Sequence, residues 1–336
     1  MNSLSNPKNI KSVSLLKVWK INMSAVRILI CDPIDPEGIE KLKKAGFSVD
    51  FLTRRESLKR DAQEYDVLIV RSRTKITREI IERGRRLKLI ARAGSGIDNI
   101  DLKVAEERGI TVLCTPEAPA DSVAELTIGL MIALARKITL ADSSMKQGRW
   151  IKKELKGLLL KGRKLGLIGL GNIGLRVAKI AKAMGMKILV TKRTPPPSEL
   201  LKSLEAEFLQ LDELLRRSDI VSIHVPLTEE TRRMIRAEEI NKMKDGAFLI
   251  NTSRGGVVDE EALLNALRSG KLGGAALDVY EVEPPERWEL IKLPNVICTP
   301  HIGAQTVEAQ KKASVMLADK IIRFFEQSKS GSTSYA

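Results

Sequence analysis

The chain has 336 residues, of which 43% are hydrophobic and 29% charged, and its formal net charge is +15. This composition indicates a globular protein long enough for two domains, and no apolar run is long enough to predict a membrane-spanning helix. Because the positive residues are spread among 42 acidic ones and aromatic residues make up only 4%, nucleic-acid binding is disfavoured and anionic small molecules are favoured as ligands.

The amino-terminal segment and the cysteines both indicate where the protein resides. Residues 1–24 hold four lysines and no acidic residue, but they lack arginine and a secretory-type apolar stretch, so a disordered extension is expected. Cys31, Cys114 and Cys298 are odd in number, far apart and without a CxxC pattern. They are interpreted as reduced core residues of a cytoplasmic protein, and no metal site is expected.

Short apolar runs alternate with helix-like segments after residue 25. Amphipathic stretches lie between the runs, and one of them ends at Gly109, as a helix ending on a glycine should. This alternation predicts βαβ units and therefore an open parallel sheet covered by helices. Strands are expected at 27–31, 48–52, 66–70, 88–91 and 111–114.

A proline-rich segment, CTPEAPAD, separates this block from the next. Ser122 and Glu125 follow it with the spacing of a capping box, which predicts the start of a helix that is apolar nearly all round. Such a helix is expected to be buried between domains or subunits. A second βαβ series runs from residue 164 to about 300, and an amphipathic helix is expected over 306–327 before a frayed tail.

A glycine-rich loop opens the second series. Gly169, Gly171 and Gly174 have the GxGxxG spacing between an apolar strand and a helix, and a second strand ends 18 residues beyond the last glycine. This context predicts a dinucleotide-binding fold of the doubly wound Rossmann type, in which the glycines allow a tight turn, a close approach to a pyrophosphate and close helix packing. The pyrophosphate is expected on the free helix amides around Asn172 and Ile173.

The second strand of this unit ends in two cations, Lys192 and Arg193, and no acidic residue follows before Glu199. An acid at this point binds the ribose hydroxyls of NAD, whereas a basic residue suits the 2′-phosphate of NADP. The two cations are either solvated surface charges or contacts of that phosphate. We expect NAD or NADP as the cofactor, with NADPH used at least as well as NADH.

The chain has only two histidines, His224 and His301. His224 lies inside an apolar strand-like run and is interpreted as a packing or cofactor-lining residue. His301 follows a strand end in a glycine-containing loop, where a side chain can titrate, so it is the preferred acid/base. Arg254 follows another strand end, and its guanidinium can hold a carboxylate through two parallel hydrogen bonds. Candidate carboxylates to orient the histidine are Asp278, Glu281 and Glu283.

Five segments, GLGNIG, HVPLTEET, INTSRGGVVDEEAL, AALDVYEVEPP and TPHIGA, occur in the order and spacing of the D-isomer-specific 2-hydroxyacid dehydrogenase family. The chain resembles this family from residue 25 to about 325. The resemblance implies that Arg254 binds the substrate carboxylate, that Glu283 orients His301, and that His301 exchanges a proton while hydride passes between C2 and the nicotinamide. It also implies further cofactor contacts at Val225, Pro226, Thr231, Thr252, Asp278, Gly303 and Ala304.

The same resemblance implies two domains and a homodimer built mainly through the nucleotide-binding domain. A flavodoxin-like α/β substrate-binding domain is expected to combine 25–118 with 305–328, and the nucleotide-binding domain to span 119–304, with a tail at 329–336. The chain leaves no room for the carboxy-terminal regulatory domain of many longer family members, so feedback through such a domain is not expected.

Within the family, the segments IVRSRTKIT and IARAGSGIDNIDL resemble those of D-3-phosphoglycerate dehydrogenases, which act in serine biosynthesis. Arg71 and Arg92 then contact the substrate phosphate, and the Ser95 and Gly96 amides hold its carboxylate. Alternatively, the two arginines pair with local acids such as Asp98 or Asp101.

The basic strand end at Lys192 departs from this subfamily and is more similar to NADP-dependent glyoxylate/hydroxypyruvate reductases, which are the alternative function. A more remote alternative is a non-catalytic protein on the same scaffold, like the corepressors of the family.

Overall fold

The computed structural model describes residues 23–330. The extension expected over 1–24 and the tail expected over 329–336 therefore lie almost wholly outside the described residues. Of the extension, only the last two residues are described, and they belong to a short 3₁₀ turn, η1 (Met23–Ala25). No helix within 23–330 is long and apolar enough to cross a membrane.

The first sheet has five parallel strands in the order β2-β1-β3-β4-β5. Its strands are β1 (Arg27–Ile30), β2 (Ser48–Phe51), β3 (Val67–Val70), β4 (Leu89–Arg92) and β5 (Thr111–Cys114). All five predicted strands are confirmed to within one residue at each end. The helices between them are α1 (Pro36–Lys44), α2 (Leu58–Asp61), α3 (Arg78–Arg83) and α4 (Leu102–Glu107).

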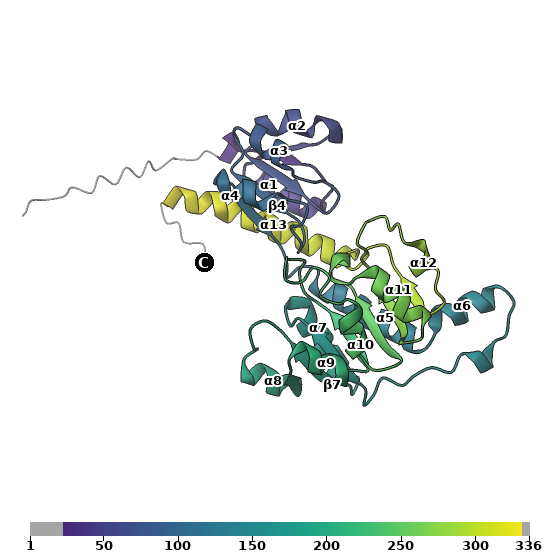
Figure 1. The fold of residues 1–336 in the computed structure, drawn as a ribbon. Helices are drawn as coiled ribbons and strands as arrows, with labels where there is room; N and C mark the ends of the chain where they lie inside the picture. Colours follow the sequence, from purple (N-terminus) through teal and green to yellow (C-terminus); the bar gives the residue numbers. More distant parts are fainter. Residues whose placement is uncertain (1–22, 331–336) are drawn as a thin grey trace, which may run out of the picture.

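The last helix, α13 (Val307–Ser330), returns to this first sheet and packs beside α1 (Figure 1). Its Leu317, Ile321 and Phe325 are buried in the core on one face of the sheet, while a second core fills the other face. The first unit is therefore built from two distant segments of the chain. The helix extends three residues beyond the predicted end at 327.

The helix α5 (Ala120–Ala135) leads from the first unit into the second. Its position confirms the expected buried helix, but the predicted capping box is wrong. The helix begins two residues earlier, after Pro119, and Ser122 lies inside its first turn. The Ser122 hydroxyl donates instead to the Gly303 carbonyl at 2.6 Å, because that loop carbonyl needs a partner in the buried contact between the two segments.

The second sheet has seven parallel strands in the order β12-β11-β10-β9-β6-β7-β8. They are β6 (Lys164–Ile168), β7 (Lys187–Thr191), β8 (Ala206–Phe208), β9 (Ile220–Ile223), β10 (Ala247–Asn251), β11 (Leu272–Leu277) and β12 (Val296–Cys298). The strand order reverses between β6 and β9, and ligands of open α/β sheets bind at such a switch point.

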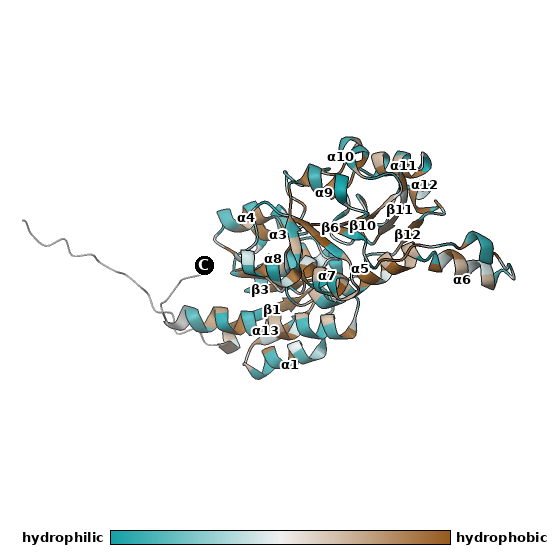
Figure 2. Cartoon of the chain, turned by 90° about the horizontal axis from the view of Figure 1, so that it is seen from below, coloured by the Kyte–Doolittle hydropathy of each residue, from teal (hydrophilic) through white to brown (hydrophobic). Residues whose placement is uncertain are grey.

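Helices cover both faces of this sheet, and each face has its own hydrophobic core. In Figure 2 the strands are largely apolar and lie between helices whose outer surfaces are polar. The helices are α6 (Ile138–Lys146), α7 (Asn172–Ala183), α8 (Ser198–Leu204), α9 (Leu211–Arg217), α10 (Ala237–Lys242), α11 (Glu260–Arg268) and α12 (Trp288–Ile291).

Both strand orders match the predicted fold class. The first sheet has the 2-1-3-4-5 order of a flavodoxin-like unit, and the second is a doubly wound Rossmann-type sheet with one additional strand. The α/β class with two parallel-sheet units is therefore confirmed. The domain boundaries at 118/119 and 304/305 stay predictions.

Candidate active site

The residues singled out in the sequence lie where parallel strands end. Arg92 ends β4 of the first sheet, while Arg254, Asp278 and His301 follow β10, β11 and β12 of the second. Residues from both units line one cleft of about 590 Å³. The lining residues are Ser72, Lys75, Arg92, Asp98, Asn99, Leu227, Arg232, Arg233, Arg254, Gly255, Gly256, Tyr280, Glu281, Val282, Glu283 and His301.

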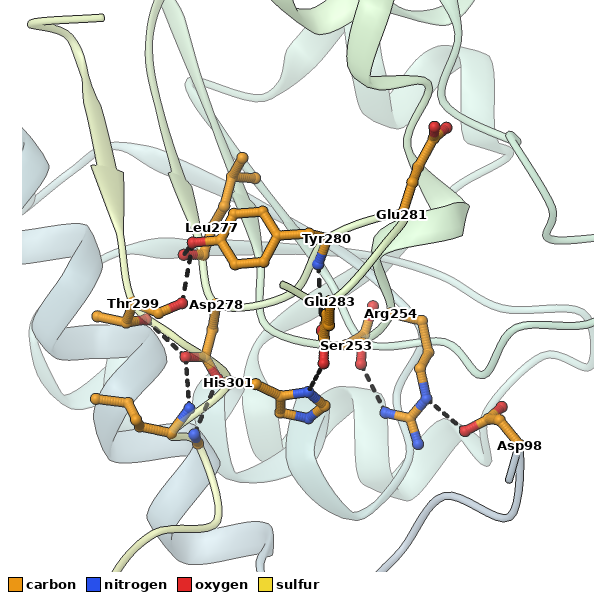
Figure 3. A network of polar contacts seen from close by, with 12 residues as sticks. Asp98, Ser253, Arg254, Leu277, Asp278, Tyr280, Glu281, Glu283, Thr299 and His301 are labelled. Carbon is orange, nitrogen blue, oxygen red and sulfur yellow. Dashed lines mark hydrogen bonds and ion pairs between the residues drawn. The ribbon is translucent and has the colours of Figure 1, made fainter. Parts of the chain in front are cut away.

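His301 and Glu283 form a hydrogen-bonded pair in this cleft, with 2.8 Å between His301 Nδ1 and Glu283 Oε2 (Figure 3). The other carboxylate oxygen accepts from the Tyr280 amide at 3.3 Å. Partial burial by itself raises the pKa of Glu283, but the hydrogen bond and charge of His301 outweigh it and hold this pKa below its ordinary value. Of the three candidate carboxylates, Glu283 is the one that contacts the histidine.

Asp278 anchors the loop that carries His301. Its carboxylate is 1% exposed and accepts from the Thr299 hydroxyl at 2.6 Å and from the Ile302 and Gly303 amides at 2.8 Å each. His301 itself has a left-handed backbone with φ of 54°, which is uncommon outside glycine and requires such support. Asp278 does not line the cleft in this structure, and its expected contact with a nicotinamide stays a prediction.

Arg254 is fixed at both its backbone and its side chain. The side-chain amide of Asn251, at the end of β10, donates from Nδ2 to the Arg254 carbonyl at 2.9 Å. The guanidinium donates from Nη1 to the Ser253 carbonyl and from Nε to Asp98 Oδ2, both at 2.7 Å. A side chain at Gly96 would overlap with Arg254 Nη2, so a glycine is required for this approach. The structure thus brings the expected carboxylate-binding residues, Arg254 and Gly96, together.

The two expected phosphate arginines have different environments. Arg92 lines the cleft, and its buried Nε has no hydrogen-bond partner in the described chain. Burial, together with the charge of Arg254, lowers the pKa of Arg92 to about 10. Arg71 is not among the lining residues, and its Nη1 donates to Gln310 of α13 at 3.4 Å.

The alternative pairing of these arginines with local acids is not found among residues 23–330. Asp98 pairs with Arg254, and Asp101 caps α4 by accepting from the Val104 amide. The charge of Arg92 is therefore not neutralised by an ion pair within the described chain and stays available to an anionic ligand.

The glycine loop has the geometry that a dinucleotide requires. Gly169 has φ of 97°, and a side chain there would meet the His224 backbone. A Cβ on Gly174 would overlap with the Gly169 carbonyl. Gly171 precedes α7, and apart from Gly171 itself and its chain neighbours no atom of the described chain lies within 4 Å of where its Cβ would be. The open space at Gly171 and the free amides of Asn172 and Ile173 thus fit a bound pyrophosphate.

The remaining expected cofactor positions lie along the same strand ends. The Thr252 hydroxyl hydrogen-bonds Thr127 of α5 at 2.8 Å, and the Thr231 hydroxyl donates to the Pro226 carbonyl at 2.6 Å. Val225 and Ala304 are half-buried. Lys192 and Arg193 are exposed directly after β7.

His224 follows the last residue of β9 rather than lying inside the strand as predicted, because β9 ends at Ile223. Its Nε2 lies 2.9 Å from the Ser222 hydroxyl, and burial lowers its pKa to about 3. The ring is therefore uncharged at neutral pH, and it does not line the cleft. This favours its interpretation as a packing or cofactor-lining residue over a role as acid/base.

Several lining residues were not predicted as site residues. They are Ser72, Lys75, Asn99, Leu227, Arg232, Arg233, Gly255, Gly256, Tyr280 and Val282. Lys75 lies in the same strand-end segment as Arg71, so the rule that ligands bind beyond strand ends could have indicated it. Arg232 and Arg233 follow a long loop after β9, and nothing in their local sequence separates them from the many other surface cations.

Comparisons with known proteins agree with this geometry. Residues 128–303 match the sequence model of the family described as D-isomer specific 2-hydroxyacid dehydrogenase, NAD binding domain. The chain belongs to the D-isomer specific 2-hydroxyacid dehydrogenases. It is therefore an oxidoreductase, and the NAD-binding fold of the family accounts for the glycine loop.

Relatives differ in their names and lengths. A hydroxypyruvate reductase of Thermotoga maritima is 50% identical, over 90% of this chain and 99% of that protein. A D-3-phosphoglycerate dehydrogenase of Methanocaldococcus jannaschii is 47% identical over 88% of this chain, which spans only 57% of the length of that protein. The solved structure of a glyoxylate reductase from Paecilomyes thermophila has a TM-score of 0.83 at 31% identity, covering 90% of this chain and 96% of that one.

Two substitutions in the glycine loop are expected to have different effects, one on dinucleotide binding and the other on stability. Gly171→Ala should leave the melting temperature nearly unchanged but weaken dinucleotide binding, because its methyl group enters open space where the backbone approaches a pyrophosphate. Gly174→Ala should lower the free energy of unfolding by about 1–3 kcal/mol, because its methyl group overlaps with a backbone carbonyl. Thermal unfolding and calorimetric titration with the dinucleotide measure both effects, and a stable Gly174→Ala variant would contradict the packing argument.

Proposed function

We propose that this chain interconverts D-3-phosphoglycerate and 3-phosphohydroxypyruvate, a reaction of serine biosynthesis. The observation that carries the proposal is the cationic lining of the cleft, above all Arg92, whose buried Nε has no partner among residues 23–330. Lys75, Arg232 and Arg233 add positive charge to the same cleft. A substrate with a carboxylate at one end and a phosphate at the other matches this lining better than a singly charged acid does.

The proposed mechanism assigns one task to each residue of the cleft. Arg254 binds the substrate carboxylate and polarises the neighbouring carbonyl. The nicotinamide, when bound, supplies or accepts the hydride at C2. His301 gives a proton to the carbonyl oxygen in reduction and takes it back in oxidation. Glu283 holds Nδ1 of His301, which leaves Nε2 for the substrate. The Ser95 and Gly96 amides add hydrogen bonds to the carboxylate.

Replacing the acid/base tests this assignment. His301→Asn should lower kcat by about 10²–10⁴-fold, since the proton must then come from water. Dinucleotide affinity, measured by calorimetry, should change by less than about threefold, because the loop around residue 301 is held by Asp278 and not by the imidazole. Near-normal turnover of the variant would refute the role of His301.

Hydroxypyruvate or glyoxylate reduction is the second candidate function. The Thermotoga relative that this chain matches over almost its whole length is named a hydroxypyruvate reductase. In addition, Arg71 binds Gln310 instead of lining the cleft, which leaves only one of the two expected phosphate arginines in place. Both observations favour a smaller, unphosphorylated 2-keto acid.

We also propose that NADPH serves at least as well as NADH. Lys192 and Arg193 are exposed at the end of β7, where the 2′ position of a bound dinucleotide is expected. Lys192 makes no hydrogen bond or ion pair with the part of the chain that the structure describes, so its charge is free to meet a phosphate.

A grid of initial rates with NADH and NADPH against phosphohydroxypyruvate, hydroxypyruvate and glyoxylate tests substrate and cofactor together. The highest kcat/KM is expected with phosphohydroxypyruvate and NADPH. A higher kcat/KM with hydroxypyruvate or glyoxylate would support the second candidate function instead. A higher kcat/KM with NADH than with NADPH would refute the cofactor proposal.

The matched variant for this grid is the double substitution Lys192→Ser and Arg193→Ser. It should raise the KM for NADPH by about tenfold, because charge-assisted contacts to a phosphate are lost, and leave that for NADH nearly unchanged. An equal change for both cofactors would show that the two cations do not distinguish them.

The proposed assembly is a homodimer formed through the segment that includes α6. This helix and the following segment project from the second unit (Figures 1 and 2). They expose large apolar side chains that a monomer would leave in water, which marks a binding surface. These are Ile138, Met145, Trp150, Leu158 and Leu159, with Trp150 77% exposed.

We further propose a cytoplasmic location, because all three cysteines are free.

Light scattering after gel filtration tests the dimer. The parent chain should have twice the mass of one chain, and Trp150→Glu should shift it toward the monomer by placing a charge in the apolar contact. Trp288→Glu is the matched control, because Trp288 is similarly exposed, at 54%, on α12. A monomeric parent at micromolar concentration, or equal effects of both substitutions, would contradict the proposed interface.

A further inference from the structure

One ion pair connects the two units directly across the cleft. Arg254 follows β10 of the second sheet, and Asp98 follows β4 of the first, 156 residues away in sequence. Their Nε and Oδ2 atoms are 2.7 Å apart, and the pair lies beside the His301–Glu283 pair in Figure 3. Family membership gives Arg254 its expected partner, the substrate carboxylate, but it does not explain why a carboxylate of the chain itself is bound to it.

The contact leaves the outer edge of the guanidinium free. A guanidinium has five N–H donors, of which Asp98 and Ser253 each take one. The Nη2 group lies against Gly96, at a point where any side chain would overlap with it. The two free donors of Nη2 therefore lie beside Gly96, whose amide is expected to bind the substrate carboxylate together with that of Ser95.

A planar guanidinium on a flexible stem binds a carboxylate well only when its orientation is fixed. The Ser253 carbonyl by itself leaves the group free to pivot about one hydrogen bond. Asp98 supplies the second fixed point, and it does so from the unit that also carries Ser95 and Gly96. The two halves of the carboxylate site, Arg254 from one unit and Ser95–Gly96 from the other, are thereby held in a fixed relative position.

We propose that Asp98 is a positioning residue that orients Arg254 toward the Ser95–Gly96 backbone and so assembles the carboxylate site of the substrate from both units. The inference rests on the proposed role of Arg254 and is independent of which 2-keto acid is reduced. In this role Asp98 does not compete with the substrate carboxylate for Arg254 but supports its binding. Asp98 uses the inner Nε donor, so it need not leave when a substrate carboxylate binds at the outer edge.

The test is Asp98→Asn, which removes the charge with little change of shape. The dissociation constant for oxamate, a carboxylate with an adjacent carbonyl, should rise about tenfold in calorimetry with dinucleotide present, because a charge-assisted hydrogen bond is lost. The KM for the 2-keto acid that the parent reduces fastest should rise similarly, while the KM for the dinucleotide and the melting temperature stay unchanged. Asp319→Asn is the control, since it breaks an exposed pair with Lys41 far from the cleft.

A double-mutant cycle separates positioning from a general charge effect. In an Arg254→Lys background, Asp98→Asn should have no further effect on oxamate affinity, because Lys lacks the fork that Asp98 orients. Equal losses in both backgrounds, tighter oxamate binding by Asp98→Asn, or no oxamate binding by the parent would overturn the inference. A parent that binds oxamate with this dependence on Asp98 but reduces none of the 2-keto acids would refute the proposed function and leave the role of Asp98 intact.

Discussion

All strand pairs in both sheets are parallel, and this constraint decides where the chemistry of the chain can occur. In a parallel sheet the carboxyl ends of all strands lie at one edge, so side chains far apart in sequence meet there. The two sheets turn these edges toward one cleft, because Arg92 at the end of β4 and Arg254 after β10 both line it. The site therefore depends on how two separate units are held against each other.

Carboxylates beyond the strand ends fix the loops of the site. A chain that leaves a sheet loses its backbone partners, and an acceptor placed there replaces them. Asp278 is buried and binds the two amides that follow His301, and Asp32, also buried, binds the amides of Arg71 and Thr74. His301 itself stays exposed. Rigid buried anchors and exposed reactive groups are the arrangement that holds a reactive side chain in place before a ligand arrives.

Local patterns predicted the strands and the glycine loop well. The spacing of apolar side chains and the backbone freedom of glycine are both properties of a few consecutive residues. The pairing of His301 with Glu283 came from family resemblance, since the residues alone left three carboxylates open. Contacts between distant segments could not be predicted. Ser122 had the spacing of a cap, but its hydroxyl binds Gly303, 181 residues away. Arg71 was expected in the cleft, but α13 brings Gln310 beside it. The role of Asp98 depends on the same kind of contact.

The charge of Glu283 in the His301–Glu283 pair follows from the direction of the Glu283 pKa shift. A carboxyl with a lowered folded-state pKa stabilises the fold fully above its unfolded value of about 4.3, and this stabilisation is lost as the pH falls through the lowered value. Glu283 is therefore ionised throughout the neutral and mildly acidic range. Its negative charge therefore faces Nδ1 of His301 throughout this pH range. Any loss of activity above about pH 5 must then arise from a group other than Glu283.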